Sequence, residues 1–208
     1  MTRLRRNGDS GQAFPIYITV VGGLLFLAFA YFAVGQAAAN RNSAQTAADA
    51  AALAAAQDRR DQLAGAWVKD LLDPTKWQQI FEGSAEGLTP SCWRAHQLAA
   101  QNDAQVAGGG CVPDGPLGFT VEVETNKSVG ESIVPGTEQQ HANATATAVI
   151  EARCDFDPPG EGTGPDVLPK LSCGEGGEWE LDPDDLDVLP DPEDLFDVHL
   201  AEPQANDE

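Results

Sequence analysis

An uninterrupted apolar run near the N-terminus is the strongest pattern in the chain. Residues 14–34 read FPIYITVVGGLLFLAFAYFAV and contain no charged residue. A helix of these 21 residues is ~31 Å long, which matches the hydrocarbon core of one bilayer. The pattern therefore predicts a single transmembrane helix over 14–34, after a basic N-terminal segment over 1–13.

The helical pattern continues past this run, because no strong helix breaker except Gly65 occurs before Pro74. We therefore predict an alanine-rich extension of the same helix over 35–73. Four alanines at helical spacing form a stripe of small side chains that would let another helix approach closely: Ala44, Ala48, Ala51 and Ala55. Three larger apolar residues continue one face further along and would support a packed domain: Leu63, Trp67 and Leu71.

Two helix-start signals follow, at Asp73-Pro74 and at Thr89-Pro90. The first predicts a short helix that ends at Gly83 and has one apolar face, formed by Trp77, Ile80 and Phe81. The second predicts a longer helix that extends through Val106 and ends in the triple glycine at 108–110.

The period then changes from helical to alternating. Residues 119–124 and 144–152 alternate apolar with polar side chains, which is typical of strands with one solvated face, and the two can pair antiparallel. Further short strands are expected near Ile133 and Val134 and, at a sheet edge, near Trp179 and Leu181. The predicted fold is α+β: a long N-terminal helix carries a small helix-plus-antiparallel-sheet domain over 74–157.

The C-terminal part of the chain is strongly acidic. The net charge is −21, and after Arg153 a single basic residue, Lys170, accompanies eighteen Asp or Glu residues. Such a chain repels phosphate backbones, so nucleic-acid binding is not expected. Residues 158–208 are predicted to be a Pro/Gly-rich and acidic segment that is partly disordered. Its apolar residues led us to hypothesise that part of it docks onto the domain or onto a basic partner: Leu181, Leu186, Val188, Leu189, Leu195, Phe196 and Val198.

The arginines before the apolar run predict the membrane topology. Arg3, Arg5 and Arg6 precede it, so the positive-inside rule places the N-terminus in the cytoplasm and the remaining domain outside a cell membrane that the chain crosses once. A cleaved secretory signal is the alternative, because small residues at 35–39 could form a cleavage site. We favour an uncleaved signal anchor, because the apolar run exceeds the usual h-region of about 7 to 15 residues and the helical pattern continues beyond it.

All four cysteines follow the apolar run, in a compartment that permits disulfides: Cys92, Cys111, Cys154 and Cys173. Four cysteines allow three pairings, and we favour the two between nearest neighbours in sequence. Zinc is the weaker alternative, because Cys92 and His96 have helical i, i+4 spacing without a companion pair.

We find no sequence pattern for a cofactor, a resident metal or an enzyme. The histidines, His96, His141 and His199, are far apart in sequence and lie in no nucleophile motif. The acidic tail lacks the glycine and terminal glutamate of an EF-hand, so solvation is favoured there over calcium binding.

Two stretches resemble a known family. NSAQTAADAAALAAA at 42–56, with the preceding SGQAFPIYITVVGGLLFLAFAYFAVGQ, resembles the TadE/TadG-like proteins of tight-adherence (Flp-type) pilus systems, particularly their form in high-GC Gram-positive bacteria. The later order of a cysteine-bearing helix, a second cysteine and two alternating strands is also similar to that family. One departure concerns processing: cleaved prepilins carry Glu at the fifth mature position, where this chain has Ile16 or Ala13. We therefore expect an uncut anchor.

The resemblance implies a pseudopilin-like architecture and a non-catalytic role as a membrane-anchored structural or assembly component of the pilus or a related secretion apparatus. The expected partners are the membrane and other pilus or secretion proteins, reached through the alanine-rich helix in a homo- or hetero-oligomer. The alternative function is a membrane-anchored extracellular binding module, such as an adhesin or envelope receptor.

Overall fold

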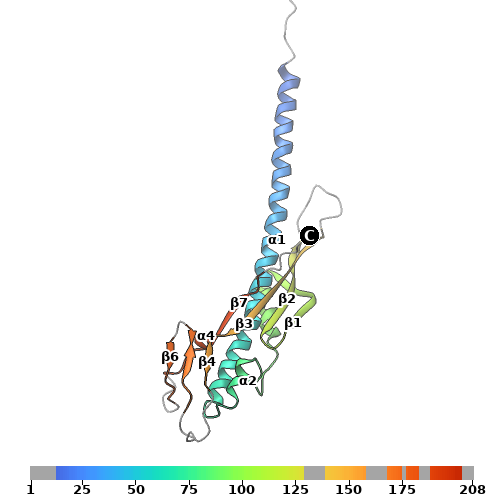
Figure 1. Cartoon of the computed structure of the whole chain (residues 1–208). Helices are drawn as coiled ribbons and strands as arrows, with labels where there is room; N and C mark the ends of the chain where they lie inside the picture. The colour runs from blue at the N-terminus through green and yellow to red at the C-terminus, as the bar shows by residue number, and fades with distance from the viewer. Residues whose placement is uncertain (1–12, 129–138, 158–167, 175–176, 183–187, 203–208) are drawn as a thin grey trace, which may run out of the picture.

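One helix of 57 residues, α1 (Ala13–Lys69), forms the axis of the molecule in the computed structural model (Figure 1). The structure describes residues 13–128, 139–157, 168–174, 177–182 and 188–202. The first half of α1 projects away from every other element, and the second half carries the head (Figure 1). The helix is continuous because its only proline, Pro15, lies in the first turn, where the missing N–H has no intrahelical partner to lose.

The head is built on a four-stranded antiparallel sheet of order β1-β2-β3-β7. Its strands are β1 (Ala104–Pro113), β2 (Gly118–Ser128), β3 (His141–Ala152) and β7 (Phe196–Leu200). Two short helices, α2 (Trp77–Phe81) and α3 (Cys92–Gln101), lie between α1 and the sheet in sequence. The predicted α+β class and the antiparallel pairing of the two alternating segments are confirmed.

Alternation along β2 and β3 decides which sheet face meets α1. The apolar positions of both strands are buried on the inner face: Phe119, Val121, Val123, Ala146, Ala148 and Ile150. On the outer face Thr120 and Thr147 are opposite each other in the register, and their hydroxyl oxygens lie 2.9 Å apart. The sheet therefore has one packed face and one polar face, as expected from the period of two.

A second, three-stranded antiparallel sheet extends the head at its distal end. It consists of β4 (Cys154–Phe156), β5 (Leu171–Cys173) and β6 (Gly177–Trp179) in that order. The edge strand predicted near Trp179 is therefore present as β6. The strand predicted near Ile133 and Val134 lies outside the described residues.

An aromatic cluster holds the distal end together. Trp67 of α1 contacts Trp77 of α2, with ring centroids 5.4 Å apart, and Trp77 contacts Phe156 of β4 at 5.2 Å. Phe81 of α2 lies 6.0 Å from Phe156 and 5.5 Å from Phe196 of β7. Four elements that are distant in sequence thus share one apolar contact, which fixes both sheets on α1.

Both predicted helix starts differ from the structure. The Asp73-Pro74 signal makes turns, because Lys76 N donates to Asp73 O at 3.1 Å, and α2 begins only at Trp77. Beside this turn, Lys76 Nζ donates to Asp70 Oδ1 at 2.8 Å, and this hydrogen bond raises the pKa of Lys76 above its ordinary value. The second helix, α3, begins at Cys92, two residues after the Thr89-Pro90 signal.

The helix predicted to extend through Val106 ends at Gln101. Asn102 Nδ2 donates to Leu98 O at 2.9 Å and closes the helix, and Asp103 then takes a left-handed conformation with φ of 55°. The chain leaves as strand β1, which contains the triple glycine. Val106 is paired with Val123 of β2, so cross-strand pairing replaced the helical extension that local sequence favoured.

The C-terminal segment belongs to the head, which continues beyond residue 157. Helix α4 (Pro192–Leu195) and β7 bring Leu195 and Phe196 into the core, where both side chains are fully buried. β7 pairs with β3 along the sheet edge. Docking of the acidic tail, which we hypothesised from its apolar residues, is therefore present over residues 188–202.

Candidate functional site

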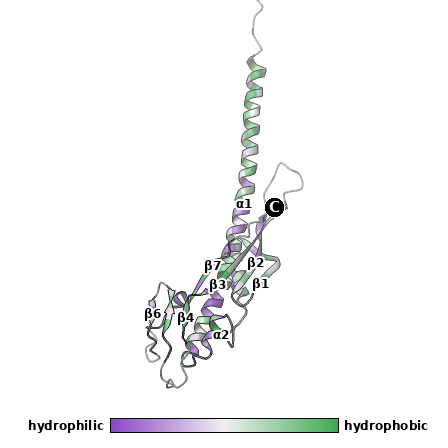
Figure 2. Ribbon diagram, viewed as in Figure 1, coloured by the Kyte–Doolittle hydropathy of each residue, from purple (hydrophilic) through white to green (hydrophobic). Residues whose placement is uncertain are grey.

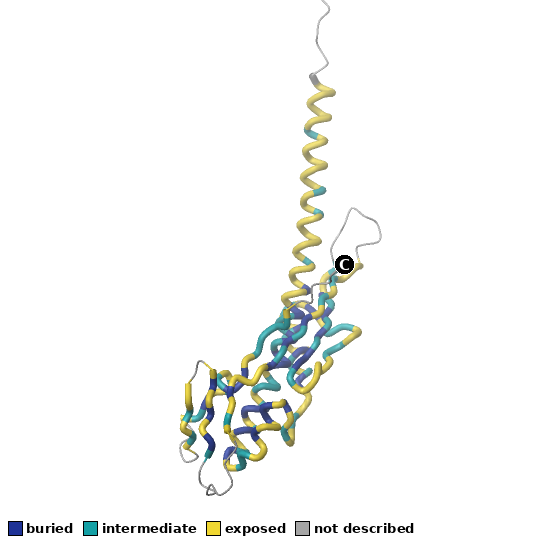
Figure 3. Tube along the Cα trace, viewed as in Figure 1, coloured by how far each residue is buried: buried dark blue, intermediate teal, exposed yellow. Residues whose placement is uncertain are grey.

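The projecting half of α1 is apolar, and no other described element of the chain covers it. Its large hydrophobic side chains from Phe14 to Val34, except that of Val21, are between 53% and 83% exposed. Figure 2 shows hydrophobic residues on all sides of this segment, and Figure 3 shows almost all of it exposed. In water this surface would be strongly unfavourable, whereas a bilayer accepts it. This helix is a candidate single-pass membrane anchor.

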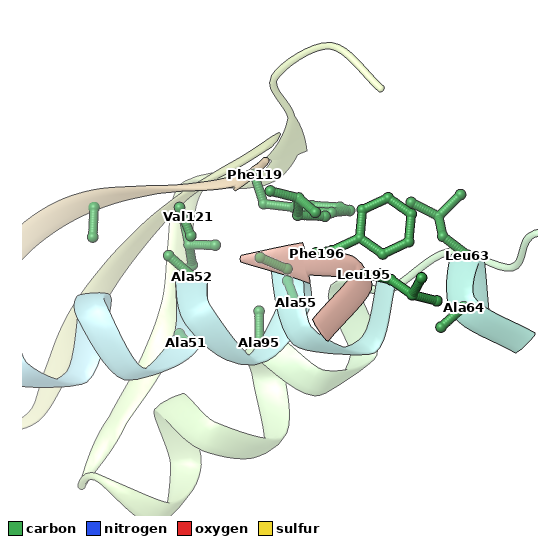
Figure 4. Close-up of a cluster of buried hydrophobic side chains, with 14 of the residues drawn as sticks. Ala51, Ala52, Ala55, Leu63, Ala64, Ala95, Phe119, Val121, Leu195 and Phe196 are labelled. Carbon is green, nitrogen blue, oxygen red and sulfur yellow. The ribbon is translucent and has the colours of Figure 1, made fainter. Parts of the chain in front are cut away.

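The alanine-rich part of the helix is buried inside the chain's own head. Ala44, Ala48, Ala51 and Ala55 are all fully buried, and so are their neighbours Ala47, Ala52 and Ala56. α1 packs against β2, β3 and β7 and also against α3. Figure 4 shows Ala51, Ala52 and Ala55 among Ala95, Phe119 and Val121, which come from α3 and β2.

This packing changes the interpretation of the alanine stripe. We expected the stripe to admit a helix of another protein, but in the structure α3 and the sheet of the same chain cover it. Alanine side chains are short, so two layers can approach the helix from different sides, which explains why the alanines are not confined to one stripe. Any contact between α1 and another protein would therefore have to use the surface of α1 that the head does not cover.

Gln62 fixes the start of α3 against α1. Its Oε1 accepts a hydrogen bond from Thr89 N at 2.7 Å, and its Nε2 donates to Ser91 Oγ at 3.2 Å and to Asp58 Oδ2 at 2.7 Å. Ser91 is 1% exposed, so this is a buried polar link. It sets the position of the first residue of α3, Cys92.

The surface of α1 that remains open lies between the apolar span and the head. We call residues 36–46 the collar. Gln36, Arg41 and Ser43 are exposed there, and so are Gln45 and Thr46. The collar is therefore the part of the helix outside the apolar span that another protein can reach most easily.

Both disulfides are present, and they join neighbours in sequence. The sulfur atoms of Cys92 and Cys111 are bonded, and so are those of Cys154 and Cys173. The first bridge ties α3 to β1, and the second joins register partners on β4 and β5. Because Cys92 is oxidised, its sulfur is not available to the zinc alternative with His96.

A comparison with known protein families found a match near the N-terminus of the chain. Residues 11–58 match the family model Tad, described as "Putative Flp pilus-assembly TadE/G-like". This segment is similar to the TadE/G-like family. The match supports a role associated with Flp pilus assembly. No curated protein and no solved structure was found to match the chain.

The TadE/G-like segment coincides with identifiable parts of the structure. It includes the whole apolar span, the collar and the buried alanines as far as Asp58. Most of the head lies outside it and follows in sequence. The family segment is therefore the anchor together with the part of the helix onto which the head packs.

The histidines occupy unrelated places in the head. His96 is exposed on α3, and His141 Nδ1 lies 2.6 Å from Thr125 O. On the outer sheet face, His199 Nδ1 lies 2.9 Å from Asp197 Oδ2 and its Nε2 lies 3.9 Å from Glu151 Oε1. The two ring nitrogens face different carboxylates, and within the described ranges no group of three or more such residues could hold a metal ion.

Sequence patterns did not indicate a cavity beside the collar. Its volume is about 580 Å³, and its lining includes three acidic residues, Asp49, Asp114 and Glu202, together with residues 145–147 of β3. The lining residues come from the helix, the turn after β1, β3 and the end of β7. No local signal joins them, because only the folded sheet brings them together.

Proposed function

We propose that the protein is a membrane-anchored structural or assembly component of a Flp-type pilus or a related secretion apparatus, and that it acts without catalysis. The observation that carries this proposal is the division of α1 into an exposed apolar half and a buried alanine half. The TadE/G-like match covers both halves and the collar between them. The helix thus combines an anchor with a rigid support that holds the head at a fixed distance from the membrane.

The proposed orientation places the N-terminus in the cytoplasm and the head outside. Arg3, Arg5 and Arg6 precede the span, and the strongly acidic head follows it, which supports this direction under the positive-inside rule. The two disulfides also support an exported head, because such bonds persist in oxidising compartments.

We further propose that the span and the collar are the contacts with other pilus or secretion proteins. The span contains Gly22 and Gly23, and an added Cβ at either would meet no other atom within 4 Å. Small residues allow close packing of helices in a bilayer, where association depends on van der Waals contact. The collar continues the same helix into the polar region just beyond.

Site-specific cross-linking in intact membranes tests this function. A photo-cross-linking residue at Ser43, which is exposed in the collar, should capture other components of the pilus machinery, identified by mass spectrometry. The matched control is Ser172, which is exposed on β5 in the distal sheet and should give little capture of those components. Equal labelling from the two positions, or capture of only unrelated proteins from Ser43, would contradict the proposal.

The second candidate function is a membrane-anchored binding module, and the cavity beside the collar favours it. Pockets of this volume are large enough for small ligands. An Asp49→Trp variant would place a large ring at the wall of the cavity. Loss of surface binding with intact pilus assembly would favour the binding module, whereas loss of pili from a Ser43→Trp variant would favour assembly.

A further inference from the structure

The two disulfides have different surroundings. Cys154 and Cys173 are 4% and 3% exposed and belong to the core, whereas Cys92 and Cys111 are only partly buried. Within the described part of the head, five large hydrophobic side chains are exposed, and two of them directly follow the cysteines of the Cys92–Cys111 bridge: Trp93 at 55% and Val112 at 52%. The Cys92–Cys111 bridge is therefore the more exposed of the two to a thiol in solution.

The two sulfurs of the accessible bridge also differ from each other. Cys92 is the first residue of the ten-residue helix α3. The N-cap side chain, Ser91, makes no capping hydrogen bond, because its Oγ accepts from Gln62 Nε2 instead. In the first turn Arg94 N donates to Ser91 O at 3.0 Å, and the positive end of the helix dipole can stabilise a negative charge on Cys92. Cys111 lies on strand β1, which offers no helix terminus.

We propose that Cys92–Cys111 is a thiol–disulfide exchange site for a dithiol protein of the exported compartment. A partner thiolate attacks Cys111 Sγ, a new S–S bond forms to Cys111, and the Cys92–Cys111 bond breaks with its electron pair on Cys92 Sγ. Cys92 leaves as a thiolate at the helix N-terminus. The partner's second thiol, on losing its proton to water, attacks the partner sulfur bonded to Cys111, and Cys111 leaves as a thiolate that water protonates.

The net reaction gives a thiolate at Cys92, a thiol at Cys111 and one disulfide on the partner, and the reverse sequence closes the bridge. Opening it removes the covalent link between α3 and the irregular part of β1, where the register shifts between Val106 and Cys111. The core and Cys154–Cys173 remain in place, because neither depends on this bond. The identity of the cellular partner rests on the exported orientation proposed above, but the chemistry of the bridge does not.

The full chain in detergent micelles tests the site without reference to pili. Dithiothreitol is added for increasing times, free thiols are trapped with iodoacetamide, and the modified cysteines are mapped by mass spectrometry. Cys92 and Cys111 should become modified at least about tenfold faster than Cys154 and Cys173, while the circular dichroism of the head stays unchanged. Equal rates, faster opening of Cys154–Cys173, or opening only on unfolding would overturn the proposal.

A monothiol separates the roles of the two sulfurs. Brief treatment with reduced glutathione, followed by acid quenching, should place the mixed disulfide mainly on Cys111 and the free thiol on Cys92. A Ser91→Asp variant places a carboxylate beside the same helix terminus, where it competes with the Cys92 thiolate, and should slow this opening several-fold. Glutathione found mainly on Cys92, or no change in rate in a folded Ser91→Asp protein, would contradict the assignment of Cys92 as leaving group.

Discussion

Phe81 of α2 and Phe196 of β7 contact each other with ring centroids 5.5 Å apart, so the last strand of the head packs against its first short helix. Phe196 is fully buried. The acidic C-terminal segment is thus held by an aromatic anchor, and its charges remain on the surface. This contact makes the tail part of the folding unit.

Replacement of that anchor should destabilise the head. Phe196→Ala removes a buried ring and leaves a cavity, which we expect to lower the free energy of unfolding by about 3–5 kcal/mol in chemical denaturation. Val188→Ala is the control: Val188 lies in the same segment but is 45% exposed, so its change should stay below about 1 kcal/mol. Similar losses for the two variants would show that the segment is not anchored through Phe196.

Larger side chains at the buried alanines of α1 should destabilise the head. Ala51 is fully buried beneath the sheet and α3, so Ala51→Leu forces extra methylene groups into a packed interior and should cost about 1–3 kcal/mol in thermal or chemical unfolding of the head. Ala38→Leu makes the same chemical change at an exposed collar position and should leave head stability unchanged. If Ala51→Leu were as well tolerated as Ala38→Leu, the alanines would not be close-packed.

Two glycines should respond to alanine in opposite directions. Gly83 has φ of +86°, and a Cβ there would lie 2.8 Å from Leu117 Cδ2 and 2.9 Å from Pro116 Cβ. Gly83→Ala should therefore destabilise the head by more than about 1 kcal/mol. Gly65 lies in α1 with nothing within 4 Å of an added Cβ, so Gly65→Ala should stabilise the helix by up to about 1 kcal/mol. Equal shifts in melting temperature would contradict this contrast.

The elements that local sequence predicted well are those specified by a short period. The helical run up to Lys69 and the alternating strands β2 and β3 repeat their pattern within a few residues, so neighbouring residues suffice to identify them. Small side chains at Ala44 to Ala55 indicate close approach, but they do not say which surface approaches. The same pattern serves a helix of another protein and the sheet of the same chain.

Long-range pairing accounts for what sequence did not predict. Val106 lies in a strand and not in the predicted helix, because it pairs with Val123 on β2. Strand β7 lies in an acidic segment where no strand was predicted, and its partner β3 is distant in sequence. The cavity beside the collar depends on both of these pairings, so neither its position nor its acidic residues could be deduced from spacing.

The lysine distribution gives a direct test of membrane orientation. All four lysines follow the span, at Lys69, Lys76, Lys127 and Lys170, and the Lys127 side chain is 80% exposed. With the head outside, a membrane-impermeant amine reagent applied to intact cells should modify Lys127 to the same extent as in purified protein. A cytoplasmic lysine-rich protein serves as the control for cell integrity. Labelling of Lys127 only after the cells are lysed would place the head inside and would reverse the orientation that the arginines predict.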